Sequence, residues 1–84
     1  MTTKQPTILI VDDERNTREG LQRALQDRYT VLLAEDSQKA VQTLESTAVD
    51  VMLTDLRMPG VDGMGLLRRA MSLSNPPVSI MMTA

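Results

Sequence analysis

The sequence has 84 residues, of which 42% are hydrophobic and 24% are charged, with a formal net charge of −2. This composition excludes an intrinsically disordered chain, and the acidic balance argues against a non-specific nucleic-acid binder. The absence of cysteine and histidine excludes disulfides, cysteine or histidine metal sites and histidine acid–base catalysis. The length fits one small domain at most, and no apolar run approaches the ~20 residues that a membrane helix needs.

Four short apolar runs, rich in β-branched side chains, predict strands. They span residues 7–11, 30–34, 49–53 (interrupted by Asp50) and 78–82. Apart from the third, the runs do not alternate polar with apolar residues, which is typical of strands buried on both faces. A parallel sheet is therefore expected.

Three stretches between these runs have apolar residues at helical spacing, and their opposite faces carry charged or amide side chains, among them Arg18. Asn16 with Glu19 three residues later predicts a cap for the first helix. Asp36 or Ser37 can cap the second. We therefore expect helices that lie with one face on a sheet. Their apolar stripes are Thr17, Leu21, Ala24 and Leu25; Ala40, Val41 and Leu44; and Leu66, Leu67, Ala70 and Met71.

The chain thus alternates strand and helix from end to end, within one unit that spans residues 1–84. This alternation predicts an α/β fold with right-handed crossovers and a parallel sheet that helices cover on both faces. In such folds, ligands bind at the carboxyl ends of the strands. The residues that follow the strands are therefore the first candidates for function.

Acidic side chains follow two of these strands. The first run ends in Asp12 and Asp13 and the third ends in Asp55, so the three carboxylates converge if the two strands are neighbours. Like charges a few ångströms apart repel, and a hard divalent cation such as Mg²⁺ relieves that repulsion. A carboxylate beside such an ion can attack phosphorus and form an aspartyl phosphate. Thr83, at the end of the fourth run, can donate its hydroxyl to a phosphate oxygen.

A purely structural role is the alternative for each acid taken singly. Asp13 can cap the first helix, and Asp55 can belong to a turn. Asp50 is expected to be a solvated residue at a strand start, and Glu35 with Asp36 a strand end and a helix cap. The joint arrival of three acids at one sheet edge is what favours a binding site.

Three segments, in this order, resemble motifs of the response-regulator receiver domain of two-component signalling. Residues 8–14 (ILIVDDE) are similar to its first strand and acid pair, and residues 53–63 (LTDLRMPGVDG) to its phosphoacceptor strand and the loop after it. Residues 78–84 (VSIMMTA) resemble its fourth strand with a hydroxyl switch residue. The run Asp-x-x-Met-Pro-x-x-x-Gly is much more specific than the acid pair, and the resemblance covers residues 7–84.

The resemblance implies a doubly wound, flavodoxin-like (CheY-like) parallel sheet with strand order 2-1-3-4, which a fifth strand extends in the family. It implies phosphoryl transfer from a histidine kinase to Asp55, with Thr83 and the backbone N–H of Ala84 in contact with the phosphoryl oxygens. It also implies a cytoplasmic phosphoacceptor, not a turnover enzyme, that switches an output such as transcription. The implied Mg²⁺ ligands are Asp12, Asp13, Asp55 and the backbone carbonyl of Arg57.

One departure from the family pattern concerns a lysine. The family carries a lysine at the end of a fifth strand, whereas the only lysines here are Lys4 and Lys39, and neither fits that motif. We therefore expect the N-terminal part of a single receiver domain, without the fifth strand and the last two helices, and with weak or no stable phosphorylation. The fourth strand then forms an exposed apolar edge, which predicts self-association, with domain swapping as one route.

Other functions remain as alternatives. A non-phosphorylated interaction or dimerisation module of the receiver fold is compatible with the missing lysine. An aspartyl-phosphate phosphohydrolase of the haloacid-dehalogenase type is a remote alternative, because that class places its two acids two residues apart, whereas Asp12 and Asp13 are adjacent. The helices and the loop after Asp55 resemble receivers of nitrogen-regulation transcription activators. We expect neither direct nucleic-acid binding by this segment nor a membrane partner.

Overall fold

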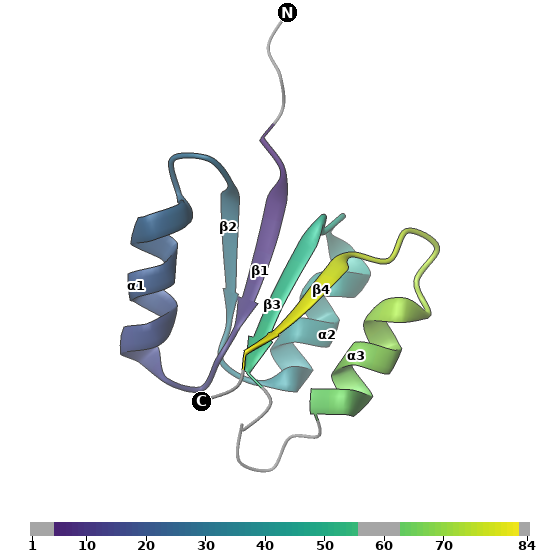
Figure 1. The fold of residues 1–84 in the computed structure, drawn as a ribbon. Coiled ribbons are helices and arrows are strands. Elements are labelled where there is room, and N and C mark those ends of the chain that lie inside the picture. Colours follow the sequence, from purple (N-terminus) through teal and green to yellow (C-terminus); the bar gives the residue numbers. More distant parts are fainter. Residues whose placement is uncertain (1–4, 56–62, 83–84) are drawn as a thin grey trace, which may run out of the picture.

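Strands and helices alternate along the chain and form a parallel sheet with helices on both faces (Figure 1). The computed structural model describes residues 5–55 and 63–82, and within these ranges four strands lie in the order β2-β1-β3-β4. This is the expected order. In the same ranges, no helix has the length and apolar character to cross a membrane. The elements are β1 (Thr7–Val11), α1 (Arg15–Leu25), β2 (Thr30–Ala34), α2 (Ser37–Ser46), β3 (Val51–Asp55), α3 (Gly63–Met71) and β4 (Val78–Met82).

Three strands have the predicted bounds, and the third is displaced. The apolar run predicts residues 49–53, whereas β3 begins at Val51 and ends at Asp55. Val49 is buried, but it packs into the core from the segment between α2 and β3, so its apolar character reflects burial rather than strand pairing. Asp50 is exposed as predicted, yet it is more than a solvated residue. Its Oδ2 accepts a hydrogen bond from the backbone N–H of Thr7 at 2.7 Å and so joins the starts of β3 and β1.

The helix caps agree with the sequence in α2 and differ in α1. Asp36 caps α2, because its Oδ1 accepts the backbone N–H of Lys39 at 2.8 Å. The prediction that Asn16 caps α1 is wrong. Glu14 is the cap residue, in an extended conformation, and its carboxylate accepts the N–H of Asn16 at 3.2 Å. The helix therefore begins directly after the acid pair, because Glu14 satisfies a backbone donor of the first turn.

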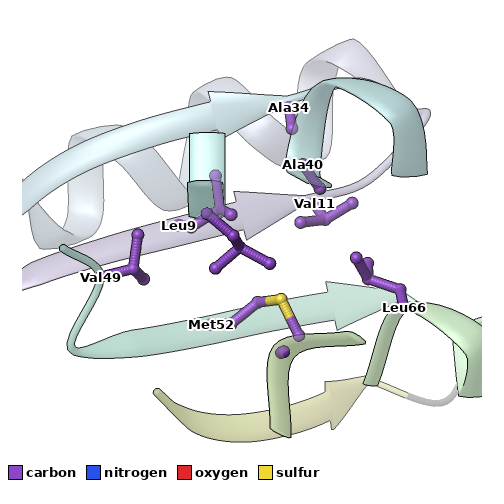
Figure 2. Packing of buried hydrophobic residues seen from close by; sticks show 9 residues of the cluster. Leu9, Val11, Ala34, Ala40, Val49, Met52 and Leu66 are labelled. Carbon is purple, nitrogen blue, oxygen red and sulfur yellow. The ribbon is translucent and has the colours of Figure 1, made fainter. Parts of the chain in front are cut away.

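The main core lies between the sheet and the helices α2 and α3 (Figure 2). Leu9 pairs in register with Met52, and both side chains are fully buried on this face. The predicted stripes of α2 and α3 contribute two buried residues each, whereas Met71, also placed in a stripe and the last residue of α3, is 64% exposed. The core cluster consists of Leu9, Val11, Ala34, Ala40, Leu44, Val49, Met52, Leu66 and Ala70.

The opposite face of the sheet is covered less completely. Ile8 and Ile10 are buried there, and α1 packs beside β1 and β2 (Figure 1). No residue of α1 is fully buried, and its predicted apolar stripe is only partly right: Leu21 and Leu25 are half-buried, whereas Thr17 and Ala24 are exposed. Through the register of β3, Ile8 and Ile10 lie in the same cross-strand rows as Val78 and Ile80 of β4. These two side chains are 66% and 49% exposed. An exposed apolar strip therefore lies along the edge strand.

Candidate metal centre

The carboxyl ends of β1 and β3 bring three acidic side chains together. Val11 pairs with Thr54 in adjacent parallel strands, so Asp12, directly after β1, and Asp55, the last residue of β3, lie side by side. Asp13 follows directly in the chain. One carboxylate oxygen from each of the three acids lies within 4.8 Å of the others. Residues far apart in the sequence thus form one acidic cluster, at the edge where α/β folds bind ligands.

The three acids differ in their exposure. Asp12 is only 4% exposed, Asp55 is half-buried at the end of β3, and Asp13 is exposed. Asp12 is also fixed by hydrogen bonds: its backbone N–H donates to the carbonyl of Ala34 at 3.1 Å, and its Oδ1 accepts the N–H of Glu14 at 2.8 Å. The cluster therefore has one rigid, buried carboxylate and two that are more accessible.

Burial and neighbouring charge make ionisation of Asp12 less favourable than that of an ordinary aspartate. The pKa of Asp12 is raised above its ordinary value of 3.8, chiefly because burial removes water from the carboxylate, and the charges of Asp55 and Asp13 raise it further. The N–H of Glu14 and the positive charge of Arg18 act in the opposite direction. A divalent cation at this cluster offsets both the loss of water and the repulsion.

The donor set fits a hard divalent cation. All three side chains offer carboxylate oxygens, the ligand type that Mg²⁺ prefers, and Mg²⁺ in proteins is commonly held by one or two carboxylates together with waters. Asp13 is exposed and Asp55 is half-exposed, so water can reach both carboxylates. Asp12 and Asp13 would hold the ion, and Asp55 would contribute the third carboxylate.

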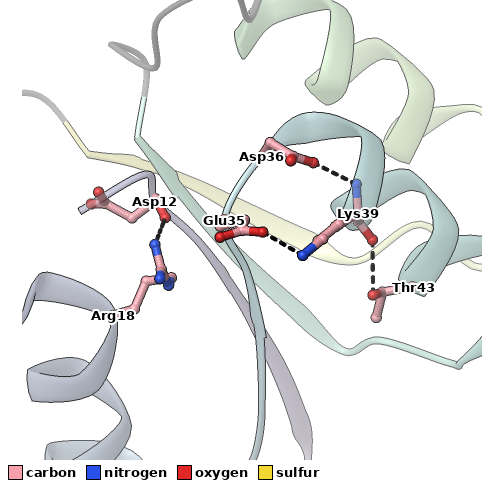
Figure 3. Close-up of polar contacts among 6 residues, drawn as sticks. All are labelled: Asp12, Arg18, Glu35, Asp36, Lys39 and Thr43. Carbon is pink, nitrogen blue, oxygen red and sulfur yellow. Dashed lines mark hydrogen bonds and ion pairs between the residues drawn. The ribbon is translucent and has the colours of Figure 1, made fainter. Parts of the chain in front are cut away.

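The other residues singled out in the sequence fall into two groups. Arg57, Thr83 and Ala84 lie outside the described residues, as do the segment after Asp55 and Lys4. Glu35 and Asp36 have local roles. Glu35 forms an ion pair with Lys39 one helical turn later, and Asp36 caps α2 (Figure 3). Neither belongs to the acidic cluster, in agreement with their interpretation as strand end and helix cap.

Sequence reasoning missed a role for Arg18 beside the cluster. Its pattern indicates a solvent-facing residue of α1, but the structure places its Nη1 2.7 Å from the backbone carbonyl oxygen of Asp12, to which it donates a hydrogen bond (Figure 3). The feature of the sequence that could have indicated this role is the position of Arg18 early in the helix that directly follows the acid pair. From there a long basic side chain can reach back to the strand end.

Comparison with known protein families identifies the family of this chain. The family model described as "Response regulator receiver domain" matches residues 8–84. The chain belongs to this family. The receiver is 38% identical over 68 residues to the hydrogenase transcriptional regulatory protein HoxA of Cupriavidus necator, a match that covers 81% of this chain and 14% of HoxA. It is 37% identical over 78 residues to the response regulator MprA of Mycobacterium ulcerans, with 92% of this chain and 34% of MprA covered.

Solved receiver structures have the same fold. The signal receiver domain of an HD domain-containing protein from Pseudomonas fluorescens superposes with a TM-score of 0.85 at 32% identity, over 96% of this chain and 60% of that chain. The chemotaxis response regulator CheY4 of Vibrio cholerae gives a TM-score of 0.85 at 27% identity, over 93% and 68% of the two chains. This receiver thus spans about a third or less of the two curated relatives named above and about two thirds of these solved chains. It is a receiver of the two-component type, and its relatives include transcriptional regulators.

Proposed function

We propose that this receiver accepts a phosphoryl group from a histidine kinase on Asp55, with Mg²⁺ as cofactor, and thereby switches an output in the cytoplasm. The observation that carries the proposal is the convergence of Asp12, Asp13 and Asp55, with one carboxylate oxygen of each within 4.8 Å of the others. Membership of the receiver family supports the kinase as the phosphodonor. The transcriptional relatives support transcription as the output.

The three acids differ in exposure, which suits one of them to accept the phosphoryl group and the other two to bind the metal ion. Half-buried Asp55 is accessible to a donor, and its carboxylate oxygen forms the new bond to phosphorus while the phosphorus–nitrogen bond of the donor phosphohistidine breaks. Rigid Asp12 and exposed Asp13 would hold Mg²⁺, which when bound would supply positive charge against the phosphoryl oxygens. The backbone carbonyl of Arg57 is proposed as a further ligand. The chain is thus a phosphoacceptor that assists its own modification, not a turnover enzyme.

The strand register supports a role for the residues after β4. Met82 pairs with Asp55 across β3 and β4, and Thr83 and Ala84 follow Met82 in the sequence. We therefore propose that the Thr83 hydroxyl and the Ala84 backbone N–H contact the phosphoryl oxygens. We also propose that residues 1–84 are the N-terminal part of a receiver unit, because the solved receiver from Pseudomonas fluorescens extends well beyond the part that matches.

The direct test is phosphorylation by acetyl phosphate, followed by intact mass. We expect a gain of one phosphoryl group that requires Mg²⁺. It should be weak and short-lived on residues 1–84, which lack the family lysine, and stronger on a form extended by the residues that complete a receiver. A mass unchanged in the extended form at saturating Mg²⁺, or a gain that persists in the presence of a chelator, would contradict the proposal.

The open edge of the sheet supports a second proposal, that the 84-residue chain associates with itself along β4. This strand is an edge of the sheet, it carries no charged residue, and Val78 and Ile80 are exposed. Unpaired backbone groups beside exposed apolar side chains favour pairing with another strand, by simple addition or by domain swapping.

Sedimentation equilibrium over a range of concentrations measures this association. We expect dimers or larger species that Ile80→Lys weakens by at least roughly tenfold in dissociation constant, because the new charge is buried when the strands pair. Met64→Lys adds the same charge at an exposed apolar residue of α3, outside the edge strand, and should leave association unchanged. A chain that stays monomeric at high concentration, or equal effects of the two variants, argues against pairing through β4.

A further inference from the structure

Arg18 is distinguished from the other arginines of α1 by its contact with the acidic cluster. Its Nη1 donates a partly buried hydrogen bond of 2.7 Å to the backbone carbonyl oxygen of Asp12 (Figure 3). Arg15 instead pairs with Glu19 in the same helix, and its side chain is 80% exposed. Arg23 is exposed in the last turn. Arg18 is therefore the arginine of α1 that joins the helix to the end of β1.

This contact completes the restraint of Asp12. The backbone N–H of Asp12 donates to the carbonyl oxygen of Ala34 in β2, and its Oδ1 accepts the N–H of Glu14. Arg18 adds a third hydrogen bond, to the backbone carbonyl oxygen of Asp12. That oxygen belongs to the peptide unit between Asp12 and Asp13, which is planar and rigid. A hydrogen bond that holds this carbonyl oxygen therefore also holds the orientation of the whole peptide plane, to which the Cα atom of Asp13 is attached. Asp13 itself is exposed, so its direction depends strongly on this peptide.

We propose that Arg18 is a positioning residue that holds the peptide between Asp12 and Asp13 so that both carboxylates face one divalent cation. The inference rests on the metal site of the proposed function. A charge-assisted hydrogen bond from a planar guanidinium is strong and directional, which suits it to this task. Groups that orient metal ligands without touching the metal commonly change metal affinity by roughly 10-fold or more when they are removed.

The test compares three variants of the chain. Arg18→Met removes the donor and keeps the bulk of the side chain, Arg18→Lys keeps a charged donor, and Arg23→Met removes the same charge from the other end of α1. Mg²⁺ affinity is measured by chemical-shift titration at low and high ionic strength. Hydrogen exchange at the hydrogen-bonded amides of Asp12 and Glu14 is measured without metal, so that the restraint is read independently of the ion.

We expect Arg18→Met to weaken Mg²⁺ binding roughly 10-fold at both ionic strengths and to accelerate exchange at both amides, with partial recovery in Arg18→Lys and no change in Arg23→Met. A gain in affinity at low ionic strength that disappears at high ionic strength, with exchange unchanged, means that Arg18 acts only through its charge and overturns the inference, because removal of a positive charge favours cation binding and salt screens that effect but not a positioning contact. Unchanged affinity in Arg18→Met also overturns it. A wild-type chain that does not bind Mg²⁺ contradicts the metal site itself, which is a distinct result.

Discussion

Replacement of Asp55 with asparagine is expected to abolish phosphorylation by acetyl phosphate, with a loss of roughly a thousandfold or more in the rate of labelling. The amide is neutral and lacks the lone-pair nucleophilicity of a carboxylate, so no acyl phosphate can form at this position. Asp55 is half-buried at the end of β3, and asparagine has nearly the same volume, so the fold should tolerate the change. The extended form, which is expected to label more strongly, gives the clearest comparison by intact mass.

Asp50→Asn is the matched control for this variant. Asp50 precedes the same strand at its other end, outside the acidic cluster, and its carboxylate oxygen bonds the N–H of Thr7. The amide oxygen of asparagine can keep that bond, so labelling should remain at the wild-type level. If Asp55→Asn labels like wild type, or if both variants lose labelling equally, then Asp55 is not the phosphoacceptor.

Replacement of Asp12 with asparagine is expected to have opposite effects on stability and on metal binding. Without metal, the free energy of unfolding at neutral pH should rise by on the order of 1 kcal/mol, because a buried charge beside two like charges is removed. The asparagine oxygen can still accept the N–H of Glu14. Mg²⁺ affinity should fall by roughly 10-fold or more, since one of the anionic ligands is lost. Urea unfolding with and without Mg²⁺ measures both effects.

The stability gain should depend on pH in a defined direction. The pKa of Asp12 is raised above 3.8 by burial and by the charges of Asp55 and Asp13, so the folded protein keeps this proton to a higher pH than the unfolded chain does. The contribution of Asp12 to the free energy of unfolding therefore decreases as the pH rises through this interval. Asp12→Asn should have little advantage near pH 3.8 and a growing one above it. A variant that is less stable than wild type at neutral pH without metal would show that the Asp12 charge is compensated within the protein.

The local sequence predicted most of the secondary structure. β1, β2 and β4 have the expected bounds because short β-branched runs have few other ways to bury themselves, and Asp36 caps α2 as expected because its side chain satisfies a donor three residues later. The places where local patterns failed have local causes. Val49 is apolar because it fills the core rather than because it pairs in β3, and Glu14 caps α1 in place of Asn16.

The residue types also define which chemistry is available: carboxylates and a hydroxyl after predicted strands, with no histidine or cysteine. Their spacing along the chain left open whether the acids meet. The strand order was expected only from the family resemblance, and the pairing of Val11 with Thr54 is what brings Asp12 beside Asp55. The burial of Asp12 and the contact of Arg18 with its carbonyl likewise arise only when β2 and α1 pack around the end of β1. Local patterns record which face of an element is apolar, whereas the distances and dielectric surroundings that set a pKa or a metal site depend on how separate elements pack together.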